Sequence, residues 1–121
     1  MAPVTVSIRP FIGAKDFEQS KAFYRELGFE EHSIDAKMSL LQLNGLAFYL
    51  QDYYAKEWVE NTMVFFEVKS AAEWFEHLQS LNLENKYPGV KLVPLRHEHW
   101  GQECMVLDPA GVLVHFGNFY R

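Results

Sequence analysis

His115 is the residue of this chain whose side chain most readily carries chemistry. It lies in the stretch WGQECMVLDPAGVLVHFGNF, where one strand, an Asp-Pro-Ala-Gly turn and a second strand are expected. Because an imidazole ordinarily titrates near neutrality, His115 is a candidate general base. No carboxylate that would orient the ring is visible in the sequence, and a lone histidine is more often a hydrogen-bonded pocket or core residue.

His97 and His99 are the second place where the spacing of side chains suggests chemistry. Residues two apart on an extended strand face the same way, so these two imidazoles could chelate a metal ion. Glu98 would point to the opposite side, which leaves two donors where about three are needed. A polar surface loop is the favoured interpretation. A metal centre built from His97, His99 and His115 is the alternative.

Arg9 and several aromatic residues point to ligand binding. The Arg9 guanidinium offers a rigid fork for a carboxylate or a phosphate of a ligand, or it forms a buried ion pair with Glu67. Trp100 is expected to line a pocket. The aromatic residues of the linker are expected to pack it against the sheets or a dimer partner, with a role as further pocket walls as the alternative: Tyr53, Tyr54 and Trp58.

Two segments of similar pattern, 54 residues apart, reveal an internal repeat over residues 14–29 and 68–83. Each opens with a helix-capping signature, in which Asp16 or Ser70 is the N-cap residue. Apolar residues then recur at helical spacing. The sequence therefore predicts one amphipathic helix in each half of the chain.

Strand patterns flank each predicted helix. A strand precedes it, over residues 6–14 and 61–69, and shorter strand-like runs follow. One hairpin is expected at Asn44-Gly45 and another at the longer turn over residues 108–111. Each half therefore reads as strand, helix, strand, strand, strand.

This repeat predicts an α+β fold of two tandem βαβββ modules that form curved mixed sheets around a cleft. We expect one domain over residues 1–121, with module one at about 4–51, a linker at about 52–60 and module two at about 61–119. A ferredoxin-like sandwich is the alternative, and the third strand after each helix disfavours it.

Alternation along the expected strands separates two faces of the sheets. One face is uniformly apolar and is expected to lie under the two helices: Ile8, Pro10, Ile12, Phe48, Leu50, Val64, Phe66, Val68, Val114 and Phe116. The other face mixes rings with charges: Arg9, Phe11, Ala47, Tyr49, Gln51, Met63, Phe65, Glu67, Leu113 and His115. Such a mixed face is typical of a ligand cavity, and a solvated face with some exposed rings is the alternative.

Composition narrows the classes of partner. The net charge is −5 and the basic residues are scattered, so nucleic acid is not an expected partner. No apolar run approaches the roughly 20 residues that cross a bilayer, and no secretory signal pattern follows the start. The single Cys104 is expected to be a small core residue, and a cytoplasmic location is the default expectation.

Two motifs resemble those of the vicinal oxygen chelate superfamily, which includes glyoxalase I, bleomycin resistance proteins, fosfomycin resistance enzymes and extradiol dioxygenases. The first has the form D-x-x-x-S-x-x-F-Y-x-x-L-G-F over residues 16–29, and the second joins Trp100-Gly101 to the Asp108-Pro109-x-Gly111 turn. The resemblance covers nearly the whole chain. It implies two modules around a cleft that a homodimer usually completes.

The resemblance also implies a set of metal-binding positions. In metal-dependent members, up to four cleft positions carry His or Glu, and these positions fall here on Arg9, Tyr49, Met63 and His115. Divalent ions need about three convergent N or O donors, and only His115 is a conventional one. The expectation is therefore a protein without a metal or other cofactor.

The function expected from these observations is metal-independent binding of a drug or metabolite by sequestration, as in bleomycin resistance proteins. The expected ligand-binding residues are Arg9, Phe11, Tyr49, Met63, Phe65, Glu67, Trp100 and His115. One alternative is a lyase or dioxygenase that holds a metal with a rearranged set of ligands. Another is a metal-free enzyme that uses His115 and Tyr49 as acid and base.

Overall fold

The computed structural model describes all 121 residues and contains two four-stranded sheets with helices packed against them. The elements follow one another as β1 (Phe11–Gly13), α1 (Phe17–Leu27), β2 (Glu30–Asp35), β3 (Met38–Leu43), β4 (Leu46–Gln51), α2 (Lys56–Val59), β5 (Met63–Glu67), α3 (Ala71–Ser80), α4 (Leu83–Lys86), β6 (Lys91–His97), β7 (Gly101–Leu107) and β8 (Leu113–Phe119). Strand, helix and three strands thus recur in each half, as predicted.

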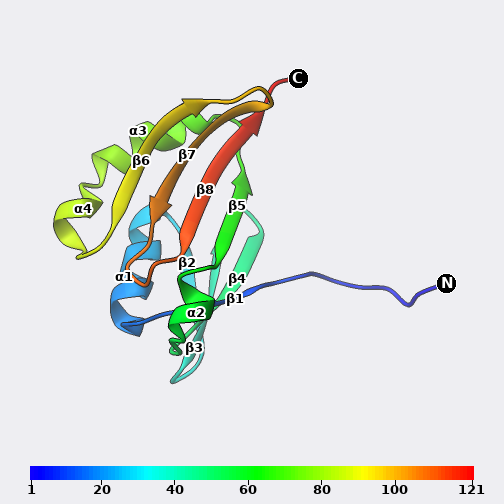
Figure 1. Cartoon of the computed structure of the whole chain (residues 1–121). Coiled ribbons are helices and arrows are strands. Elements are labelled where there is room, and N and C mark those ends of the chain that lie inside the picture. Colours follow the sequence, from blue (N-terminus) through cyan, green and yellow to red (C-terminus); the bar gives the residue numbers. More distant parts are fainter.

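Both sheets have the same mixed topology. Their strand orders are β1-β4-β3-β2 and β5-β8-β7-β6. The first and last strand of each module run parallel, and the other neighbours are antiparallel. Figure 1 shows the second sheet curving across the molecule, with α3 and α4 on one side of it. The predicted α+β class with two βαβββ modules is confirmed.

The two long helices begin where the capping signatures predict. The Asp16 side chain accepts a hydrogen bond from the Gln19 amide, and the Ser70 hydroxyl accepts one from the Glu73 amide. Both hairpins also form at the predicted residues. Asn44 has a positive φ of 52° and Gly45 one of 81°, which matches the twist of the flanking strands.

The first predicted strand is much shorter than expected. Residues 1–10 lie outside any strand, and Ile8 is 95% exposed, so its assignment to the buried face is wrong. Pro10 is exposed as well. The reason is that β1 pairs with β4 only from Phe11, opposite Tyr49, and no other strand of the chain lies beside the preceding residues. Figure 1 shows this N-terminal segment extending away from the body.

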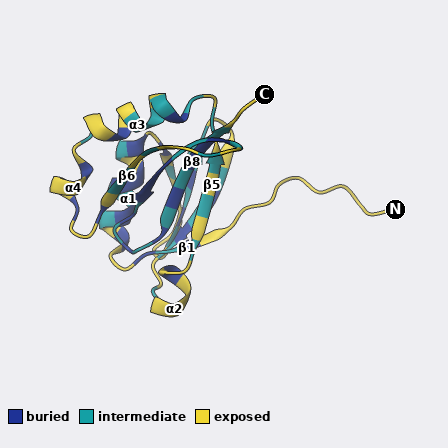
Figure 2. Cartoon of the chain, turned by 45° about the horizontal axis from the view of Figure 1, so that its top comes forward, coloured by how far each residue is buried: buried dark blue, intermediate teal, exposed yellow.

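The remaining residues of the predicted apolar face lie under the helices. Five of them are at most 4% exposed: Ile12, Phe48, Leu50, Val114 and Phe116. The β5 residues Val64, Phe66 and Val68 are half-buried and pack against this core. In Figure 2 the buried segments lie between the sheets and the helices, whereas α2 and the N-terminal segment are exposed.

Helix α1 fastens the two halves together. The buried Tyr24 hydroxyl donates to Asp108 at 2.7 Å, in the turn between β7 and β8. Glu26 accepts hydrogen bonds from Lys86 and Tyr87, and the Leu27 carbonyl is 2.9 Å from His77 Nε2. The second half is therefore held by both polar and apolar contacts of one helix.

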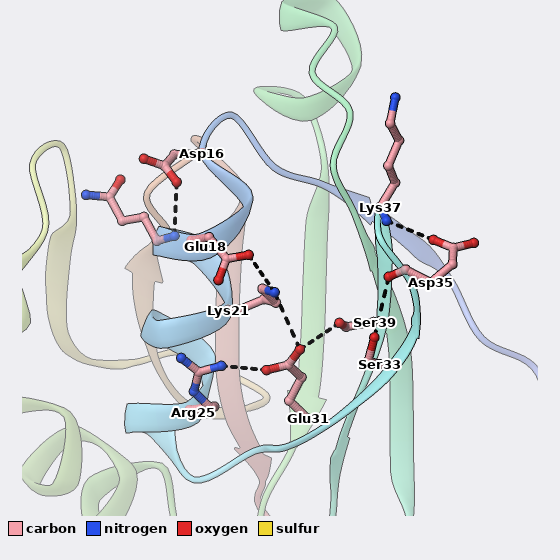
Figure 3. Close-up of polar contacts among 10 residues, drawn as sticks. Asp16, Glu18, Lys21, Arg25, Glu31, Ser33, Asp35, Lys37 and Ser39 are labelled. Atoms are coloured by element: carbon pink, nitrogen blue, oxygen red, sulfur yellow. Dashed lines mark hydrogen bonds and ion pairs between the residues drawn. The ribbon is translucent and has the colours of Figure 1, made fainter.

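A polar cluster joins the same helix to β2 and β3 (Figure 3). Glu31 accepts a hydrogen bond from the buried Ser39 hydroxyl at 2.7 Å and one from Arg25. Its second oxygen lies 3.7 Å from the Lys21 ammonium. These contacts satisfy a half-buried carboxylate, so the cluster has a structural role.

No helix of the chain has the length and apolar character needed to span a membrane.

Candidate functional site

The face of the second sheet that turns away from the helices gathers half of the predicted site residues. Alternation places Met63 and Phe65 of β5 and His115 of β8 on this outer face, because β5 and β8 pair in register at Phe65 and His115. With Val64, Trp100 and Glu103 these side chains line a hollow of about 390 Å³. The predicted residues Met63, Phe65, Trp100 and His115 are thus brought together.

His115 has a carboxylate partner that sequence reasoning missed. Its Nδ1 lies 2.6 Å from Glu103 Oε1, and the two side chains are only 16% and 13% exposed. Glu103 lies on β7 opposite Gly117, one diagonal step from His115 on the same face. The interpretation of His115 as a histidine without an orienting carboxylate is therefore wrong. Counting the register back from the Asp108–Gly111 turn is the signal that would have revealed Glu103.

The other ring nitrogen of His115 is buried and has no hydrogen-bond partner. Since an ionised carboxylate only accepts hydrogen bonds, the hydrogen shared with Glu103 belongs to Nδ1. In the neutral ring Nε2 then carries a lone pair. Leaving such an acceptor unpaired away from water costs about 1–3 kcal/mol, which favours a bound group that donates to it.

Three aromatic side chains form a cluster beside the imidazole. The ring centroids of Trp100 and Phe119 lie 5.2 Å apart. The centroid of the Phe65 ring lies 6.0 Å from that of Trp100 and 5.9 Å from that of Phe119. The His115 ring is 6.2 Å from that of Phe65. Phe119 was not among the predicted site residues. The periodicity of β8 contains the signal, because Phe119 is four residues after His115 and shares its face.

Gly117 makes room for an aromatic ring of this cluster, and Gly101 allows the backbones of β7 and β8 to approach closely. A Cβ atom on Gly117 would lie 2.6 Å from Phe65 Cζ, so the Phe65 ring lies directly over the backbone of β8. A Cβ atom on Gly101 would lie 2.0 Å from the Asn118 carbonyl oxygen. The backbone of Trp100 is fixed beside the end of β8, because its carbonyl accepts a hydrogen bond from the Tyr120 amide at 2.9 Å.

Arg9, Phe11 and Tyr49 form a separate group on the first sheet. Arg9 Nη1 donates to the Tyr49 hydroxyl at 3.1 Å, and the Phe11 and Tyr49 rings stack with centroids 5.1 Å apart. Phe11 lines a different hollow, with Tyr53 and Trp58. Within one chain these residues do not meet His115, so the pairing of Tyr49 with His115 as acid and base does not form.

Glu67 does not pair with Arg9, so the ion pair, one of the two alternatives for Arg9, is wrong. The Glu67 carboxylate accepts from Arg121 at 2.8 Å instead. The physical reason is that Arg9 lies before β1 begins and turns to Tyr49. Glu67, Arg121 and Phe65 line a further groove of about 960 Å³, together with the first residues of β4.

The donor sets proposed for a metal do not fit one. No group of three or more His, Cys, Asp or Glu side chains lies close enough to hold an ion. His97 ends β6 on the surface, where its Nδ1 lies 3.2 Å from Gln102 Nε2. The rearranged set of His97, His99 and His115 is therefore not assembled. Of the four positions implied by the resemblance, Arg9 and Met63 supply no suitable donor.

Two buried titratable groups of the second module, Cys104 and Asp108, have structural roles. Burial, followed by the charge of Glu103, raises the pKa of Cys104 to about 11, so this buried thiol stays protonated at neutral pH. Burial raises the pKa of Asp108, although Tyr24 and the amides of Val112 and Ala110 donate to its carboxylate. Asp108 therefore fixes the turn and takes no part in the hollow.

The chain resembles solved structures of other proteins in its fold. No family model matches the sequence, and no curated protein matches it. A bleomycin resistance determinant encoded on the transposon Tn5 superimposes with a TM-score of 0.82 at 21% identity, over 97% of this chain and 100% of that one. The bleomycin-binding protein of Streptomyces verticillus, complexed with copper(II)-bleomycin, gives 0.81 at 20% identity, over 98% and 100%.

An enzyme has the same fold. Lactoylglutathione lyase from Agrobacterium tumefaciens superimposes with a TM-score of 0.71 at 16% identity, over 94% of each chain. The fold of the vicinal oxygen chelate superfamily, predicted from the two motifs, is confirmed. Because binding proteins and a lyase share it, the fold does not decide the activity, and the residues of the site must.

Proposed function

We propose that this protein binds a small aromatic molecule over the outer face of its second sheet and sequesters it without chemical change. The observation that carries the proposal is the aromatic cluster of Phe65, Trp100 and Phe119 beside the half-buried His115–Glu103 pair. Flat apolar walls with one well-placed polar group are typical of ligand sites. A drug of the kind bound by the bleomycin-binding relatives, or a metabolite, fits this description, and antibiotic resistance would be the cellular consequence.

Metal independence is part of the proposal. It is supported by the side chains at the four implied ligand positions, Arg9, Tyr49, Met63 and His115, of which only His115 is a conventional donor. Plasma mass spectrometry on untagged protein offered Fe²⁺, Mn²⁺, Ni²⁺ and Zn²⁺ should find far less than one ion per chain. One tightly held ion per chain would contradict this part of the proposal.

A homodimer is the assembly we propose. Aromatic residues are exposed on the outer faces of both sheets, among them Phe11 at 58% and Phe65 at 44%. Apolar side chains of the N-terminal segment are almost fully exposed: Val4, Val6 and Ile8. A second copy that covers these surfaces would deepen the shallow hollow into a cleft.

The free thiol of Cys104 is consistent with the reducing cytoplasm that we propose as the location of the protein.

The binding function is tested by titrating the protein with metal-free bleomycin and with a panel of planar aromatic drugs, using calorimetry. At least one compound should bind saturably, and mass spectrometry should recover it unchanged. Trp100→Ala should weaken its binding tenfold or more. The matched control is Trp58→Ala, which removes an exposed ring outside the hollow. Binding that is indifferent to Trp100 would contradict the proposed site.

A second candidate function is proton transfer by a metal-free enzyme. It is favoured by one observation, the Glu103–His115 pair, because a carboxylate on one imidazole nitrogen is the usual way to orient a general base. In this case the compound that binds would be converted, and Glu103→Gln would lower the rate of conversion more than the affinity. A flat pH–rate profile between about pH 5 and 8 would remove His115 as the base.

A further inference from the structure

The aromatic hollow contains one buried polar atom that has no hydrogen-bond partner. Its lining is formed by Met63, Val64, Phe65 and Trp100, together with the Glu103–His115 pair. Glu103 Oε1 accepts from the imidazole, and His115 Nε2 is the buried atom without a partner. A ligand in the hollow can therefore either donate a hydrogen bond to this nitrogen or leave it without a partner.

The charged groups around the pair leave the ring without a second partner. Arg96 of β6 lies opposite Glu103 in the strand register, and Glu67 of β5 is held by Arg121. No acid other than Glu103 and no base is bonded to the ring. In the neutral imidazole, Glu103 thus fixes the hydrogen on Nδ1, and Nε2 is left as an acceptor.

We infer that His115 Nε2 selects the ligand by accepting a hydrogen bond from an N–H or O–H group of a planar aromatic molecule packed against Phe65, Trp100 and Phe119. Glu103 is the positioning residue that fixes the imidazole tautomer. The inference rests on the proposed binding function and names the ligand class. Because Nε2 is covered in the free protein, the side chains around it must shift when the ligand reaches it.

Ligands with a donor are preferred because a buried acceptor without a hydrogen bond raises the free energy of the complex. A ligand with a donor replaces an unpaired acceptor by a hydrogen bond. A ligand of the same shape without the donor leaves Nε2 unpaired, as it is in the free protein, and so gains no hydrogen bond there. The expected preference for the donor-bearing molecule is about tenfold or more.

The tautomer can be tested on the free protein. Long-range proton–nitrogen correlation spectra of protein with ¹⁵N-labelled histidine, at pH 7, should show His115 with a protonated Nδ1 and an unprotonated Nε2. Glu103→Gln should change that pattern, because an amide can donate to Nδ1, whereas His97→Gln should only remove the His97 signals. A protonated Nε2 in the unaltered protein would overturn the inference and leave the binding function untouched.

The selectivity is tested with two probes that differ only in the donor, 2-naphthol and 2-methoxynaphthalene. In the unaltered protein and in His97→Gln, the naphthol should bind about tenfold tighter or more. In His115→Phe, which keeps a flat ring but removes the nitrogen, the two affinities should become equal. Equal affinities in the unaltered protein would overturn the inference alone. If neither probe binds at its solubility limit, both the inference and the proposed site are overturned.

Discussion

Two neighbouring carboxylates, Glu103 in β7 and Asp108 in the turn that follows, have different roles. Glu103, within β7, faces the hollow and orients His115. Asp108, just after the same strand, is 1% exposed and accepts from the Tyr24 hydroxyl and from the amides of Ala110 and Val112. One residue of the motif Asp-Pro-x-Gly therefore stabilises the fold, and a carboxylate outside the motif serves the site.

Tyr24→Phe tests the structural role of Asp108. The change leaves one buried oxygen of Asp108 without its donor, so the free energy of unfolding in urea should fall by about 1–3 kcal/mol. The control is Tyr120→Phe, whose hydroxyl is exposed and makes no hydrogen bond within the chain, and which should change stability little. Equal effects of the two substitutions would contradict the assigned role of Asp108.

Ion pairs of α1 set the acid stability of the elements it joins. Hydrogen bonds from Lys86 and Tyr87 lower the pKa of Glu26 from its ordinary 4.5. For Glu31, burial raises the pKa, but the hydrogen bonds of Ser39 and Arg25 and the charges of Lys21 and Arg25 together outweigh it and lower it. A carboxyl group whose pKa is lowered by folding stabilises the folded state above the unfolded pKa.

Unfolding at different pH values tests these contacts. The stability that Glu26 contributes should be complete at pH 7 and should disappear as the pH falls below about 4.5 through the folded pKa. Glu26→Gln should therefore be less stable than the unaltered protein at pH 7, and the difference should shrink by pH 3. Glu84→Gln, on the exposed side of α4, serves as the control and should show no such convergence. A difference that stays constant with pH would contradict the ion-pair account.

The sequence predicted the elements better than their contacts. Capping residues, turn residues and alternation are local signals, so both helices, both hairpins and the facing of Phe65 and His115 could be read directly. The partner of His115 could not be read from any local signal, because it emerges only when the register between β7 and β8 is counted back from their turn. The ion pair of Arg9 with Glu67 does not form for another reason. Arg9 precedes β1 and donates to Tyr49 of the first sheet, whereas Glu67 lies on β5 of the second sheet and accepts from Arg121.

At the scale of the whole molecule, the N-terminal segment is the feature that one chain does not explain. Val4, Val6 and Ile8 alternate on one side of an extended segment and are 93–96% exposed. Figure 1 shows that the segment reaches well beyond the sheets. Apolar side chains arranged in this way are expected to be covered by the second copy of the proposed homodimer.

Substituting all three residues tests this expectation. Val4→Ser, Val6→Ser and Ile8→Ser combined should raise the dimer dissociation constant tenfold or more, as measured by light scattering across a dilution series. The matched control combines Thr5→Ala and Ser7→Ala on the opposite side of the segment, and it should leave the constant unchanged. Dimers that dissociate equally in all three proteins would show that the segment does not hold the assembly together.

The central claim is that the outer face of the second sheet is the ligand site. The measurement that tests it most directly is a map of chemical-shift changes, in protein labelled with ¹⁵N and with ¹³C at methyl groups, for each compound that binds. The account predicts that the largest changes fall on Trp100 Nε1–H, on the methyl groups of Met63 and of Met105, which lies opposite His115 on β7, and on the backbone of residues 115–119. Ligands whose changes fall mainly on Phe11, Tyr49 and Trp58, or on the groove beside Leu46, would contradict it.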